Sequence, residues 1–149
     1  MFRPLLIGSV LAVAATMALS EDDDMVRVEA AGSVAETADR LQAAVEGAGA
    51  KVFARVNHGG GAASVGMELA DAELLVFGNP KLGTPALQSD IRAGLVLPLR
   101  VLVYDDGGQT VMLYEKPAEM FDDYDIPSDA EVVQAMTGAL GKLTGAAAE

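Results

Sequence analysis

The spacing of the apolar residues changes repeatedly along this chain, and this feature limits its fold more than any other. Residues 26–30 alternate apolar and charged side chains, which predicts a strand with one buried face. Apolar side chains then recur at three- and four-residue spacing from Val34 to Ala48, which predicts an amphipathic helix. Residues 51–56 predict a second strand. The chain is therefore expected to combine strands and helices in one domain.

Three more strands are predicted downstream. Residues 73–77 are apolar on both faces over most of their length, which favours a strand inside the sheet. Residues 95–104 predict the next strand, and Pro98 marks either a sheet edge or the start of that strand. Residues 105–108 predict a hairpin turn that leads into a return strand over residues 110–114.

Two capping boxes mark the starts of helices. Residues 33–36 and 128–131 each place a serine at the N-cap and a glutamate three residues later. The second box precedes an apolar stripe that predicts a C-terminal helix. Residues 57–61 include three successive glycines and predict a flexible turn, residues 62–69 predict one or two helical turns, and residues 117–127 predict an irregular acidic segment.

Residues 1–20 have the features of a secretory signal peptide. Arg3 is the only charge of a short basic region, an apolar segment follows, and small residues at positions −3 and −1 predict cleavage after Ser20. Residues 21–24 would then form an acidic tail, and residues 25–146 a single domain. We expect export to the periplasm or the extracellular space, without stable membrane insertion after cleavage; an uncleaved anchor is the alternative.

The charge and the absence of cysteine exclude several classes of function. Cleavage would remove Arg3 and leave nine basic residues against 22 acidic ones, a formal charge of −13. Such a surface repels phosphate backbones, so nucleic acid is not expected as a partner. The chain has no cysteine, which excludes disulfides and cysteine nucleophiles. With a single histidine as well, we expect no metal site and no cofactor.

No group of residues matches a known catalytic centre. Residues 58–61 are similar to the oxyanion-hole turn of lipases, but the segment around Ser64 lacks the first glycine of a nucleophile elbow. His58 precedes that serine, whereas those hydrolases place the base last. We therefore assign no catalytic residue, and enzymatic activity is not expected.

Residues 78–85 are the strongest candidate for a ligand site. They predict a loop before a short helix, with Thr84 at the N-cap and Pro85 in the first turn. Free N–H groups at such a helix start, with Lys81 beside them, suit a small anion. The alternative is that these residues only shape a tight connection between strand and helix. The candidate ligand-binding residues are Gly78, Asn79, Lys81, Gly83, Thr84, Gln88 and His58.

Two stretches of the chain resemble the domain of unknown function 302 family. They are Leu-Val-Phe-Gly-Asn-Pro-Lys at residues 75–81 and Leu-Pro-Leu-Arg-Val-Leu-Val-Tyr at residues 97–104. The resemblance extends over most of residues 25–146. It implies an α+β fold with a curved, mainly antiparallel sheet and packed helices in the order β-α-β(4)-α, of the TATA-binding-protein-like class. It also implies a homodimer, but it implies no reaction.

Two functions from different classes follow as expectations. In the first, the domain is a small-ligand binding module of the cell envelope, and its ligand is a small anion. Its groove would lie between the sheet and the C-terminal helix, with residues 78–85 at the mouth. In the second, the domain is a homodimeric interaction or accessory protein with no small ligand.

Overall fold

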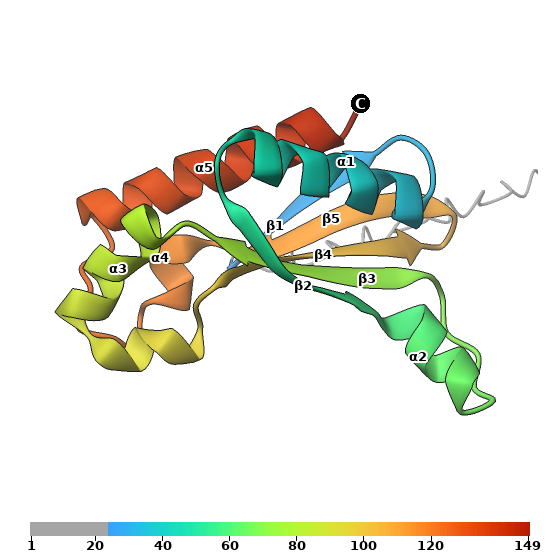
Figure 1. Ribbon diagram of the computed structural model, residues 1–149, viewed down its shortest axis with the longest axis horizontal. Helices are drawn as coiled ribbons and strands as arrows, with labels where there is room; N and C mark the ends of the chain where they lie inside the picture. Colours follow the sequence, from blue (N-terminus) through green and yellow to red (C-terminus); the bar gives the residue numbers. More distant parts are fainter. Residues whose placement is uncertain (1–23) are drawn as a thin grey trace, which may run out of the picture.

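A five-stranded antiparallel sheet forms the centre of the computed structural model, which describes residues 24–149 (Figure 1). The strands lie side by side in the order β1-β5-β4-β3-β2, and each neighbouring pair is antiparallel. The expected signal peptide, residues 1–20, lies outside the described residues. The strands are β1 (Met25–Ala30), β2 (Lys51–Asn57), β3 (Ala72–Gly78), β4 (Leu99–Asp106) and β5 (Gln109–Glu115).

Two long helices cover one face of this sheet (Figure 1). Helix α1 (Val34–Gly47) connects the two edge strands β1 and β2, and helix α5 (Glu131–Ala147) packs beside it. Their apolar stripes meet the buried side chains of the sheet, as the three- and four-residue spacing predicts. The centre of the core contains Leu41, Val45, Leu75, Phe77, Val101, Val103, Met112, Met136 and Leu140.

The order of the elements confirms the predicted fold class. The chain runs β-α-β(4)-α, with short helices added between the strands, and its sheet is antiparallel throughout. The first capping box is also confirmed. Glu36 N donates to Ser33 Oγ at 3.3 Å, and Ser33 N donates to Glu36 Oε2 at 2.8 Å.

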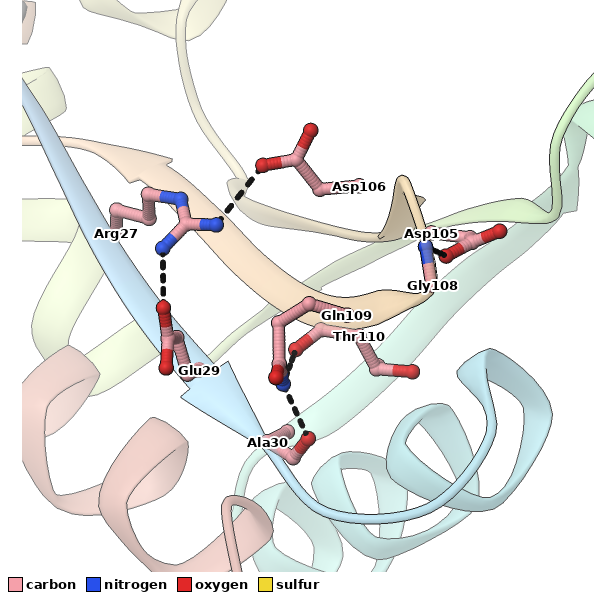
Figure 2. Close-up of polar contacts among 8 residues, drawn as sticks. All are labelled: Arg27, Glu29, Ala30, Asp105, Asp106, Gly108, Gln109 and Thr110. Atoms are coloured by element: carbon pink, nitrogen blue, oxygen red, sulfur yellow. Dashed lines mark hydrogen bonds and ion pairs between the residues drawn. The ribbon is translucent and has the colours of Figure 1, made fainter. Parts of the chain in front are cut away.

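The hairpin between β4 and β5 forms at the predicted turn (Figure 2). Gly107 and Gly108 have φ angles of 64° and 98°, which other residues adopt only with strain. Asp105 Oδ1 accepts a hydrogen bond from Gly108 N at 2.7 Å and fixes the turn. Arg27 on β1 then joins the hairpin to the sheet edge through an ion pair with Asp106 at 2.8 Å.

Two of the predictions for irregular segments are wrong. The segment predicted as a flexible turn forms helix α2 (His58–Ser64), because the side chain of Asn57 caps it by accepting from Gly60 N at 2.6 Å. The acidic segment contains one helical turn, α4 (Pro117–Met120), which the proline starts at its first position. No helix among residues 24–149 is long and apolar enough to cross a membrane.

The second capping box does not form. Helix α5 begins at Glu131, its N-cap is Ala130, and no side chain caps it. Ala130 N instead donates to Pro127 O at 2.9 Å, which closes a turn around Ser128 and Asp129. Ser128 therefore lies inside this turn instead of at the N-cap, and the helix starts two residues later than its sequence pattern predicts.

Candidate functional site

A cavity of about 340 Å³ lies at the end of the sheet, beside helix α3 (Pro80–Ser89). The segment after α3 forms another wall; it includes a short 3-10 helix, η1 (Ile91–Leu95). Apolar side chains make up most of the lining, and the polar side chains among the lining residues are those of Asn79 and Thr84. The apolar lining residues are Phe53, Pro80, Leu82, Leu87, Leu97, Pro98, Leu99 and Met136.

The end of β2 and β3 shapes the floor of this cavity. The pairing register of the two strands shifts between Val52 and Ala54, so Phe53 lies in a bulge and contributes to the lining. Gly78 ends β3 between two walls: a Cβ atom there would lie 3.5 Å from Phe53 Cε2 and 3.6 Å from Pro98 Cβ. A larger side chain at this position would therefore intrude on the cavity.

Gly83 keeps the other side of the cavity open. A Cβ atom on this residue of α3 would meet no atom within 4 Å. The free volume beside Gly83 is therefore available to a ligand, although a glycine inside a helix costs about 1 kcal/mol relative to alanine.

A second hollow adjoins the first and contains two lysines. It shares Gly78, Asn79, Leu82 and Leu99 with the cavity and has a volume of about 600 Å³. It runs along α5, where small residues leave room beside the helix, and both Lys81 and Lys142 line it. The small lining residues are Ala135, Gly138 and Ala139 on α5 and Ala48 and Ala50 between α1 and β2.

The prediction that α3 starts at Thr84 is wrong. The helix begins at Pro80, with Asn79 as its N-cap, and Pro85 lies inside it. Asn79-Pro80 and Thr84-Pro85 are both pairs of a cap residue and a first-turn proline, spaced about one turn apart. The earlier pair starts the helix, which lets Leu82 pack against the core.

This earlier start removes the predicted backbone cradle for an anion. Pro80 has no N–H, Lys81 N donates to Asn79 Oδ1 at 3.0 Å, and Leu82 N and Gly83 N each donate to Asn79 O at 2.9 Å. The amides of residues 86–88, which were expected to face a ligand, belong to the body of the helix. The positive groups that remain for an anion are lysine side chains.

Most, but not all, of the predicted site residues lie together. Gly78, Asn79, Gly83 and Thr84 line the cavity, and Lys81 lines the adjoining hollow. Gln88 is exposed on α3 and lines neither of them. His58 is exposed on α2, and α2 and α3 lie at opposite ends of the sheet (Figure 1).

Several lining residues were not predicted from the sequence. Met136 belongs to the apolar stripe of α5, and its spacing indicates only a core position. Lys142 lies on the same helix, and nothing in the local pattern distinguishes it from any exposed lysine. The run of small residues at 135, 138 and 139 was the available signal, because small side chains leave space where a helix faces a neighbour.

The two lysines of the hollow have no carboxylate partner. The ammonium groups of Lys81 and Lys142 form no ion pair or hydrogen bond with another residue in the range 24–149. Glu131 lines a small hollow with Lys81 without pairing with it. Lys51 does not line this hollow; its Nζ lies 5.7 Å from the centroid of the Phe53 ring, a cation–π contact.

A family described as "Domain of unknown function DUF302" matches residues 26–143. A crystal structure titled as an uncharacterized conserved protein DUF302 from Bacillus stearothermophilus aligns with a TM-score of 0.77. It is 19% identical and covers 84% of this chain and 98% of the other. That likeness shows the fold alone.

Curated relatives have a different kind of name. A protein of Brucella suis biovar 1 (strain 1330) named "Fluoride-specific ion channel FluC 1" is 38% identical over 134 residues. A protein of the same name from Brucella abortus biovar 1 (strain 9-941) is also 38% identical over 134 residues. The match covers 89% of this chain and 53% and 50% of those proteins, so the chain spans about half the length of the relatives it matches.

Proposed function

The chain belongs to the DUF302 family, and we propose that it is a small-ligand binding module of the cell envelope. The observation that carries the proposal is the cavity beside α3, whose lining is largely apolar. Its volume of about 340 Å³ falls within the range of ligand pockets, about 300–1,000 Å³. An apolar ligand that displaces water from such walls gains about 25 cal/mol for each Å² of apolar surface it buries.

The proposed function involves binding without a catalytic step. Among the residues described, no acidic, histidine or serine side chain lines the cavity. Asn79 and Thr84 at its rim supply hydrogen-bonding groups that orient a ligand.

Export is part of the same proposal and rests on residues 1–20. The expected result is that protein recovered from the cell envelope has the intact mass of a chain that begins at Glu21. A full-length species that stays in the membrane after an alkaline wash would instead support an anchor.

A thermal-shift screen with matched variants tests the binding function. Small apolar compounds should raise the unfolding temperature of the wild type. At a ligand concentration one hundred times Kd, the free energy of unfolding should rise by about 2.7 kcal/mol. Gly83→Leu should abolish this gain, because its side chain extends into the open volume of the cavity. Gly141→Leu is the control: it also adds a side chain where a Cβ meets no atom within 4 Å, but Gly141 lines neither cavity nor hollow.

The outcome of this screen is decisive for the proposal. Equal stabilisation of the wild type and Gly83→Leu would show that the compounds bind elsewhere. No stabilisation by any compound would overturn the binding function. Fluoride belongs in the panel because of the name of the Brucella relatives, and the apolar walls predict that it has no effect.

The second candidate function is a homodimeric interaction module, and the surface beyond α2 favours it. Val65, Met67 and Leu69 are 70%, 67% and 57% exposed, and α2 itself buries no residue. Three large apolar side chains this exposed within five residues suit a contact with a second copy of the chain.

A further inference from the structure

We propose, on the basis of the binding function above, that the ligand is an amphipathic anion: an alkyl chain that ends in a single carboxylate. The alkyl chain occupies the cavity beside α3. The carboxylate lies in the adjoining hollow, between the ammonium groups of Lys81 and Lys142. The site thus consists of an apolar part and a positively charged part, side by side.

The shared wall of the two spaces provides the first support. Gly78, Asn79, Leu82 and Leu99 border both the cavity and the hollow, so one elongated molecule can extend from one to the other. The apolar side chains of the cavity offer no partner for a charge, and burial of a charge there is unfavourable. The charged end of a ligand therefore has to lie in the hollow.

The charge of the protein provides the second support. The full chain has 22 acidic and ten basic residues, so an exposed lysine is expected to have a carboxylate close by. Lys81 and Lys142 nevertheless come from different helices to the same hollow, and neither forms an ion pair within residues 24–149. An anion held between them would supply the missing partner, whereas a cationic ligand would be repelled.

The same observations distinguish this ligand from a small inorganic anion. Phosphate and sulfate bind best where several backbone N–H groups or an arginine converge. The first N–H groups of α3 are already bonded to Asn79, and no arginine lines either space. Two flexible ammonium groups provide attraction without such a cradle, so much of the affinity has to come from the apolar tail.

Calorimetric titration with three ten-carbon probes tests the inference. The probes are decanoate, decanol and decylamine, each below its critical micelle concentration or its solubility limit; they have the same number of carbon atoms and carry a negative, a neutral and a positive head group. We expect wild-type protein to bind decanoate about three- to tenfold more tightly than decanol at low salt. The difference would come from two partly exposed ion pairs, which the carboxylate forms with Lys81 and Lys142. Decylamine should bind least. High salt should remove most of the difference between decanoate and decanol.

A double variant assigns the effect to the two lysines. Lys81→Gln with Lys142→Gln should bind decanoate and decanol with equal affinity. Arg100→Gln is the control, because it removes a positive charge from an exposed residue that lines neither space. Glu131→Gln should strengthen decanoate binding, since this carboxylate lies near Lys81.

Failure of the inference differs from failure of the binding function. Equal affinity of the wild type for decanoate and decanol would overturn the inference that the ligand is an anion. It would leave the proposal that the cavity binds a small ligand intact. A preference for decanoate that survives in the double variant would overturn the assignment to Lys81 and Lys142. If none of the three probes binds, and an unfolding curve shows that the protein is folded, both proposals would be overturned.

Discussion

Asp90 connects three segments, two of which border the cavity. Its side chain is 7% exposed and accepts hydrogen bonds from Arg92 N at 2.9 Å and from the Arg92 guanidinium at 2.6 Å. Asp125 N also donates to it at 3.1 Å. The guanidinium of Arg92 and these backbone donors hold the pKa of Asp90 well below its ordinary value. One carboxylate thereby fixes the end of α3, the start of η1 and the loop that follows α4.

Asp90→Asn should lower stability in a pH-dependent manner. A lowered folded-state pKa means that the carboxylate stabilises the fold above its ordinary pKa of about 3.9. The difference in unfolding free energy between the wild type and the variant should be constant from pH 5 to pH 8. It should shrink below about pH 4 and vanish as the pH falls through the folded-state pKa.

Urea unfolding at pH 7, 5 and 3 measures this difference. Asp123→Asn, at an exposed aspartate, serves as the control and should match the wild type at each pH. A destabilisation by Asp90→Asn that increases on acidification would contradict the assigned role of the carboxylate.

At the scale of single elements, the sequence predicts the strands and long helices well and the helix starts less well. Alternating apolar and charged residues placed β1 to within one residue, and the hairpin turn at residues 105–108 placed β5 to within one residue at each end, because both signals are local in the sequence. The start of α3 was misplaced because two cap residues, Asn79 and Thr84, each precede a proline, and that of α5 because Ser128 does not cap the helix that its pattern predicts. Packing of Leu82 decides the first case, and the turn closed by Pro127 decides the second.

Ser33→Ala and Ser128→Ala should differ sharply in their effect on stability. The side chain of Ser33 accepts from Glu36 N, so its removal should cost about 0.5–2 kcal/mol. Ser128 caps no helix, so its replacement should cost less than about 0.5 kcal/mol. Denaturant unfolding curves of the two variants measure both values, and equal losses would contradict the observed start of α5.

At the scale of the whole molecule, the sequence did not reveal which elements meet. The cavity brings together Phe53 from β2, Leu87 from α3 and Met136 from α5. Contacts so distant in the sequence depend on the order β1-β5-β4-β3-β2, which no local pattern encodes. The resemblance to a family supplied the fold class, and the pattern of residues 78–85 supplied part of the candidate site, whereas the adjoining hollow and Lys142 required the structure.

The arrangement of the exposed apolar side chains predicts a dimer that uses the α2 end of the molecule. Light scattering in solution should give the mass of two chains for the wild type. Val65→Glu with Met67→Glu should give the mass of one chain, because charges at the contact oppose association. Ile91→Glu is the control: Ile91 is 77% exposed but lies in η1, beyond α3. A monomeric wild type would contradict the interaction function.

The bulge at Phe53 also determines how the free edge of the sheet behaves toward other molecules. Strand β2 is an outer strand, and outer strands expose backbone groups that can pair with another chain and begin aggregation. The shift in register interrupts this row of groups, and the exposed Lys51 places a positive charge beside the interruption, whereas Arg55 is paired with Asp39 and Glu73. Two copies that approached edge to edge would therefore meet an interrupted hydrogen-bonding ladder. The bulge at Phe53 therefore both completes a wall of the cavity beside α3 and interrupts the backbone groups through which another chain could pair.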